Sequence, residues 1–482
     1  MGFIFPSQVS CFDRIWESDS LLDPLARDKL KSTLSTLRPS GTTTGDDVTL
    51  NLIDHRLYSL VYNKTLVSHF NGKVYRPIPA PLSTDIYTVS PHFMLLPSDV
   101  SVSADATSVK FLSYINNLHP IEHLVTYAQL EHLLAGFIPL FERTLTDLHR
   151  NNPPVQRIPG RCHYTVWDEP EPPEHSDDEE GWVTYESEMR EWSLNRPINL
   201  PDVPDAGYSG GLEKRRRFVT LRDRTVQIVV SASEITLVSA EYSFIFEFSH
   251  PLAPSASRGP SLHGLFLACG RNAERAYRGL WFSLSVSSEL LSTISQHWAE
   301  LMILQENITG QSIKFRMAVT YPRGFSAGDT GATLRTWGIR DGDSCHQYIG
   351  EIFIREGLSV VFPNIYQHSL TPFTLADPSM AGHLTAIWFF LIDPEIKPVI
   401  STSVAGPQQK EWIGKALDDN LDTRLPNELI QNILDNVEGL MSQDEAMDYR
   451  EQFVRETDQF TQASNSYHFC IPFDIWNGPE IL

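Results

Sequence analysis

Two short apolar runs, residues 358–362 and 386–392, constrain the fold of this chain more than any other feature. Each run is followed by a proline that stands beside an asparagine or an aspartate. Apolar runs of this length that are closed by turn residues are typical of buried strands. His368 lies between the two runs, in a Gln-His-Ser-Leu-Thr-Pro-Phe segment that we expect to be a third strand entering a turn. A histidine between core strands is a metal ligand, a general base or a hydrogen-bonded core residue, and the choice among these decides the function.

The rest of the chain supplies more strands and several helices. Residues 218–230 and 242–248 alternate with a period of two, as half-buried antiparallel strands do. From residue 121 to residue 149 the apolar residues recur at helical spacing, which predicts one amphipathic helix bent at Pro139. Helices are also predicted at residues 21–37, at 284–304, from Leu425 and after a capping box at 442–445. The sequence therefore predicts an α+β protein, with antiparallel strands in its middle and C-terminal half and helices around them.

Composition divides the chain into four regions. We expect residues 1–150 to form a mixed, partly helical region packed on the core. Residues 151–212 are poor in apolar residues and rich in Pro, Asp and Glu, which predicts a partly disordered acidic excursion on the surface. The strands of the core are expected in residues 213–412, and a C-terminal helical region in residues 413–482.

Charge and cysteine content narrow the class of protein. A net charge of −22 argues against a nucleic acid or an anionic membrane as a partner, because both need a positively charged surface. No apolar run approaches the length that spans a bilayer, and the N-terminus lacks the basic and apolar regions of a signal peptide. Five cysteines, never spaced as Cys-x-x-Cys, suit a reducing compartment. We expect a soluble cytoplasmic protein whose oligomeric state is left open.

Motifs spread over nearly the whole chain resemble those of one family. They are IDHRLYSLVYNKTLV from Ile53, SYINNLHP from Ser113, ENITGQSIKFR from Glu306, WGIRDGD from Trp337, FPNIYQHSLTPFTLADPSMAGH from Phe362, FFLIDP, PQQKEW, LPNELI and DEAMDYREQFVRET. The family is a large, mainly fungal one catalogued as a domain of unknown function, number four-two-four-six. Its members look like iron(II)- and 2-oxoglutarate-dependent oxygenases. The resemblance implies a double-stranded β-helix, the cupin-like jelly roll, as the core of the fold.

Oxygenases of this kind need two histidines and a carboxylate on iron, and a cation that holds the far carboxylate of 2-oxoglutarate. By the resemblance, His368 matches the second histidine. The arginine expected after the Gly-His of residues 382–383 is replaced by Leu384. The expected Trp-His-x-Glu segment falls near residues 285–288, where no side chain binds a metal.

Other histidines leave an alternative open. His250 and His263 are possible first ligands, although neither has a carboxylate two residues further on. The His-x-Asp/Glu pattern occurs once, at His175 and Asp177, inside the acidic excursion. His297 and Glu300 have the spacing of a pair on one helix face, which is more often a surface pair than a metal site.

The candidate site is built around His368 as a general base or hydrogen-bond donor. Asn364 and Gln367 flank it and are expected to orient it or a ligand carbonyl. We predict no metal; if one binds, His368 is its ligand. Five aromatic residues are expected to line a substrate pocket: Trp337, Tyr366, Phe373, Trp388 and Phe390. Strand alternation places Phe389 on the face opposite Trp388 and Phe390.

We interpret the chain as a metal-independent enzyme that needs no cofactor and transforms a small, mostly apolar substrate. A cyclase, isomerase or pericyclase of fungal secondary metabolism fits, because confining a flexible substrate in a reactive conformation supplies much of the acceleration. One alternative is an iron(II)- and 2-oxoglutarate-dependent dioxygenase with rearranged ligands. Another is a non-catalytic binding protein.

Overall fold

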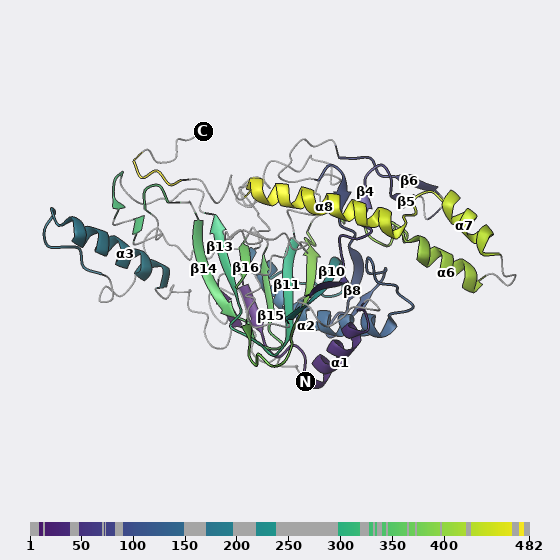
Figure 1. Ribbon diagram of the computed structural model, residues 1–482, viewed down its shortest axis with the longest axis horizontal. Helices are drawn as coiled ribbons and strands as arrows, with labels where there is room; N and C mark the ends of the chain where they lie inside the picture. Colours follow the sequence, from purple (N-terminus) through teal and green to yellow (C-terminus); the bar gives the residue numbers. More distant parts are fainter. Residues whose placement is uncertain are drawn as a thin grey trace.

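Figure 1 shows the computed structural model. It describes residues 9–12, 15–38, 48–69, 72, 74–81, 90–148, 170–195, 218–237, 297–318, 327–330, 333–334, 340–343, 346–363, 366–371, 374–395, 398–420, 426–464 and 472–476. These residues form antiparallel sheets and six helices, so the α+β class expected from the sequence is confirmed. The expected strand at residues 242–248 lies outside the described residues.

A nine-stranded antiparallel sheet, the large sheet, forms the centre of the molecule. Its middle strands lie in the order β15 (Ser359–Pro363), β11 (His297–Glu306), β18 (Gly382–Ile392) and β10 (Thr225–Leu237). The outer strands are β1 (Val9–Phe12), β2 (Ile15–Ser18), β3 (Val48–Ile53), β8 (Ser98–Val102) and β9 (Val109–Phe111). The apolar runs at residues 358–362 and 386–392 form strands β15 and β18, as predicted, and β11 lies between them in the sheet.

A smaller sheet faces the inner side of the large sheet. Its strands lie in the order β14 (His346–Phe353), β13 (Ser312–Ala318) and β16 (Gln367–Leu370). Apolar side chains of both sheets form one buried cluster between them, which includes Phe315, Phe362 and Trp388. The core is therefore a two-sheet sandwich. Three short pairs complete the strands: β12 (Ile308–Thr309) with β17 (Thr374–Leu375), β4 (Leu60–Val61) with β7 (Phe93–Met94), and β5 (Leu66–His69) with β6 (Val74–Pro77).

Helix α2 (Leu124–Leu148) covers the outer side of the large sheet. It is the amphipathic helix predicted from the sequence, with Pro139 inside it. Phe137 of α2 meets Phe389 of β18 edge-on, with 5.9 Å between ring centroids. By length and composition alone α2 is long and apolar enough to cross a membrane, which the sequence analysis did not anticipate, but most of it is buried in this core.

The other helices lie at the edges and ends of the sandwich (Figure 1). Helix α1 (Pro24–Ser35) begins at Asp23, whose side chain accepts a hydrogen bond from the backbone of Ala26. Helices α6 (Lys410–Asn420) and α7 (Asn427–Asn436) pack on each other. Helix α8 (Gln443–Ser464) crosses one end of the sheets (Figure 1). One of the two hydrogen bonds of the predicted capping box is present, since Ser442 Oγ accepts a hydrogen bond from the backbone N–H of Glu445 at 3.3 Å.

The structure adds detail to one expectation and corrects another. The acidic excursion contains α3 (Glu179–Asn195), whose Tyr185 and Met189 pack against Leu334. These few apolar side chains lie on one face of α3, which packs against the rest of the protein. The low apolar content of the whole segment 151–212 did not reveal this face. Residues 297–304, predicted as part of a helix, belong to strand β11. Because β11 is paired on both edges and residues 301–304 are buried on both faces, its apolar residues do not alternate and the pattern imitates a helix.

Candidate functional site

His368 lies between the two sheets and is enclosed by aromatic rings. It is on β16, directly opposite Phe315 of β13. Its ring centroid is 4.9 Å from that of Phe362, 5.7 Å from that of Trp388 and 6.5 Å from that of Phe315. These rings come from both sheets, and the side chain of His368 is 2% exposed. The strand predicted from the sequence is confirmed, and it directs His368 into the core.

Burial decides the charge of this histidine. Loss of hydration disfavours the protonated ring and lowers the pKa of His368 to about 4. The imidazole is therefore neutral near pH 7. A neutral ring among aromatic side chains serves as a hydrogen-bonding or weakly basic group, not as a cation.

A wall of aromatic rings leads from His368 toward helix α8. Trp388 and Phe390 of β18 stack with an interplanar angle of 4° and 5.9 Å between centroids. Phe390 is half-buried, and the ring of His55 lies 5.6 Å from it on another side. Phe390 also packs against a buried cluster that includes Val229 of β10 and Phe453 of α8. As alternation predicted, Phe389 points to the other side of the sheet, toward α2.

Two distant sequence motifs meet beside this wall. Asp54, in the turn that also carries His55, forms an ion pair with Arg450 of α8, and both side chains are 11% exposed. Burial raises the pKa of Asp54, but Arg450 and His55 outweigh this effect and hold it below its ordinary value. Neither His55 nor Arg450 was among the candidate residues predicted from the sequence. The available signal was that both stand in the family-like motifs from Ile53 and at 444–457.

The other predicted site residues have different outcomes. Tyr366 is 1% exposed and belongs to the same inner cluster as Trp388. Gln367 is on β16 opposite Arg316, while its side chain lies outside the described residues. Asn364, Trp337 and Phe373 also lie outside the described residues, so their roles stay predictions.

His383 does not join His368. It stands on the outer side of β18, where Thr236 Oγ1 is 3.2 Å and Glu234 Oε1 is 3.6 Å from its Nδ1. Arg38 pairs with the same Glu234 at 2.6 Å. This cluster fastens the segment after α1 to the sheet. The next residue, Leu384, is fully buried in the inner cluster.

The described residues around His368 do not supply a complete set of iron ligands. Among the residues that the structure describes, no group of three or more His, Cys, Asp or Glu side chains is placed to hold a metal. The printed sequence offers no Trp-His-x-Glu segment before Glu306. Among the described residues, His368 is thus a single matching ligand with the rings of Phe315, Phe362 and Trp388 around it, and no step of an iron mechanism is assigned to these residues.

The fold and the site define an α+β protein whose core is an antiparallel sandwich with a neutral histidine enclosed between its sheets. The chain belongs to the family described as protein of unknown function (DUF4246), whose model matches residues 4–246 and 299–416. The matched residues leave out 247–298, the segment in which the resemblance expects the first two iron ligands. No curated protein matches the chain.

One similar solved structure is described as a selenomethionine-labelled Fe(II)/α-ketoglutarate-dependent dioxygenase, TqaL. It is 8% identical to this chain, and the match covers 79% of this chain and 95% of the other. The TM-score is 0.23. A likeness of this size supports no conclusion about the site.

Proposed function

We propose that this chain is a metal-independent enzyme, of the cyclase, isomerase or pericyclase type, that confines a small, mostly apolar substrate at the aromatic end of its sandwich. The observation that carries the proposal is the continuous aromatic wall from His368 through Trp388 to the half-buried Phe390. Such a surface recognises shape and apolar area, and it favours substrates that fold against it.

The strand order supports a jelly roll as the scaffold. A jelly roll is an eight-stranded pair of facing antiparallel sheets. Here four strands of the large sheet, β15, β11, β18 and β10, face the three strands β14, β13 and β16. The described residues thus supply seven strands of such a sandwich, and β16, which carries His368, is one of them.

The chemistry assigned to the chain's own residues is limited to binding and orientation. The exposed part of the Phe390 ring forms the floor of the substrate site, meaning the surface on which the substrate packs. The Trp388 ring stacks on Phe390 and holds it in place. His55, beside Phe390, is the polar group placed to donate or accept one hydrogen bond. His368 packs beside Trp388 and holds its ring in place. The neutral imidazole also contributes its dipole next to the aromatic rings. Stabilisation of a polarised transition state by one or two fixed hydrogen bonds is sufficient for isomerisations of this type.

The first experiment tests the metal. Anaerobic iron(II) binding is measured on metal-stripped protein, with and without 2-oxoglutarate, beside the variant His368→Asn. We expect no one-to-one iron(II) complex in either protein. A tight one-to-one complex that 2-oxoglutarate perturbs and His368→Asn loses would overturn the metal-independent reading in favour of the rearranged dioxygenase.

The second experiment tests the aromatic floor. Binding of a fluorescent apolar probe is compared for the native protein, Phe390→Ala and Phe353→Ala. Phe353 is a matched control because it is 71% exposed on β14, away from the wall. We expect Phe390→Ala to weaken probe binding several-fold and Phe353→Ala to leave it unchanged. Equal effects of the two substitutions would contradict a binding floor at Phe390.

A further inference from the structure

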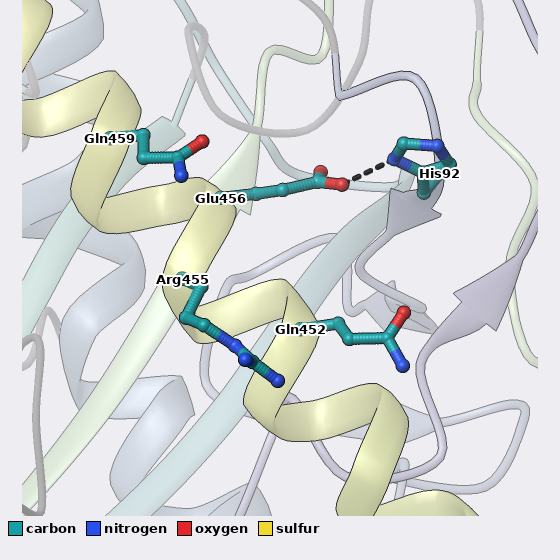
Figure 2. A pocket seen from close by; sticks show the side chains of 5 residues that line it. All are labelled: His92, Gln452, Arg455, Glu456 and Gln459. Atoms are coloured by element: carbon teal, nitrogen blue, oxygen red, sulfur yellow. Dashed lines mark hydrogen bonds and ion pairs between the residues drawn. The ribbon is translucent and has the colours of Figure 1, made fainter.

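A hollow lies on the surface of helix α8. Its volume is about 220 Å³, and His92 together with four residues of α8 line it: Gln452, Arg455, Glu456 and Gln459 (Figure 2). The four helical residues follow the spacing of a single helix face, so their side chains project to the same side. All five side chains are polar, unlike the aromatic wall beside His368. This hollow is therefore chemically distinct from the proposed substrate site.

Glu456 holds the ring of His92 in a fixed orientation. One carboxylate oxygen pairs with His92 Nδ1 (Figure 2), and the other accepts a hydrogen bond from Ser90 Oγ at 2.6 Å. Ser90 Oγ in turn accepts the backbone N–H groups of His92 at 3.2 Å and Phe93 at 2.9 Å. A carboxylate oxygen can only accept, so in the neutral ring the proton is on Nδ1 and Nε2 is an acceptor. The side chain of His92 is 66% exposed, which leaves Nε2 open to a ligand.

Arg455 supplies the positive charge of the hollow. Its Nε donates to the backbone carbonyl of Glu451 at 3.3 Å, and the carboxylate of Glu451 is 3.9 Å from a terminal nitrogen. Both side chains are about two-thirds exposed, so water competes strongly with this pair. Figure 2 shows the guanidinium extending to the same side of α8 as the Gln452 amide. Arginine presents several N–H donors in a plane that suits carboxylate and phosphate.

We propose that this hollow is a binding site for the oxyanion group, carboxylate or phosphate, of a small polar molecule. Arg455 binds the anion, and the amides of Gln452 and Gln459 add hydrogen bonds. His92 Nε2 accepts a hydrogen bond from a hydroxyl of the same ligand. The net charge of −22 repels anions at a distance, but salt screens it beyond about 8 Å, so the local contacts decide binding.

The test follows the imidazole signal of His92 by proton–carbon NMR of the full chain. The variant His92→Gln identifies the signal by its loss. Inorganic phosphate and citrate are titrated separately into the native protein, Arg455→Gln and Lys110→Gln. Lys110→Gln is the matched control, since it removes one positive charge from strand β9. Thermal unfolding midpoints verify that all variants are folded.

We expect phosphate or citrate to shift the His92 signal with saturation. We expect Arg455→Gln to weaken the binding roughly tenfold and Lys110→Gln to leave it within about twofold, because a charge-assisted hydrogen bond is stronger than a distant charge effect. The response to phosphate compared with citrate distinguishes the two oxyanions. Saturable shifts that survive Arg455→Gln, or the absence of a saturable shift with both anions, would overturn the proposal.

Discussion

Burial makes the charge state of His368 depend on the fold. In the unfolded chain a histidine titrates near pH 6.5, whereas the folded protein lowers the pKa of His368 to about 4. Between these values the unfolded state binds one more proton than the folded state. Stability contributed by the neutral ring is thus complete above pH 6.5 and is lost as the pH falls toward 4.

Acidification from pH 7 to pH 5 lowers the free energy of unfolding. We expect this decrease to be about 2 kcal/mol larger for the native protein than for the variant His368→Phe. Phenylalanine fills a similar volume among Phe315, Phe362 and Trp388 and carries no titratable group. Urea unfolding of both proteins at the two pH values measures the difference. An identical loss of stability in both proteins would mean that His368 is hydrated in solution.

Gly382 is a second residue whose identity the packing dictates. A Cβ atom at this first position of β18 would lie 2.6 Å from Leu375 Cδ2, 2.9 Å from Ile308 Cγ1 and 3.0 Å from the carbonyl oxygen of Asn307. We expect Gly382→Ala to destabilise the protein by about 1–3 kcal/mol in chemical unfolding. Gly406→Ala is the control, because no atom lies within 4 Å of its Cβ position, and it is expected to be close to neutral.

At the scale of elements, the local pattern of apolar residues was sufficient to predict a helix or strand where that element has one buried face. Helix α2 and the start of α8 were predicted because their apolar spacing and capping residues are local signals. Strand β11 was predicted wrongly because burial on both faces removes the alternation that identifies a strand. The position of α8 was not predictable, since its ion pair with Asp54 and the buried cluster that it shares with Val229 join residues that are far apart in the sequence.

The ion pair between Asp54 and Arg450 is expected to fix α8 in place. Asp54→Ala leaves Arg450 largely buried without this ion-pair partner. We therefore expect the free energy of unfolding to fall by about 3–5 kcal/mol. The double variant Asp54→Ala/Arg450→Met is expected to lose less than the two single substitutions together, which a double-mutant cycle measures. Lys64→Ala removes the more exposed pair with Glu445 of the same helix and is expected to cost about 1 kcal/mol or less. Additive single effects would contradict a coupled pair.

At the scale of the whole molecule, an early strand and a late helix are parts of one body. Strand β2 pairs with β15 at one side of the large sheet, and α8 contributes Phe453 to a buried cluster that contains Val229 of β10. Residues from three of the four regions proposed from composition, 1–150, 213–412 and 413–482, therefore lie in shared sheets and clusters. The sequence indicated the class of the fold but not this sharing, because strand partners depend on long-range pairing.

We accordingly expect a single cooperative unfolding transition in urea. Circular dichroism in the far ultraviolet and tryptophan fluorescence should give the same midpoint, because Trp16 of β2 and Trp388 of β18 lie in the buried clusters on the two faces of the large sheet. Separate midpoints for the two signals would show that the N-terminal strands unfold independently of the sandwich.

The pairing of β10 with β18 has a consequence for synthesis on the ribosome. Ile228 pairs with Leu391 and Leu237 with Gly382, so β10 acquires this neighbour only after the ribosome has made most of the chain. Until then a strand that is buried along nearly its whole length in the native fold is present in the nascent polypeptide without this partner. Sheets assembled from such remote segments fold slowly, and their exposed strands associate with other chains. Yield of the native protein should therefore depend on translation rate and chaperone supply more than on its final stability.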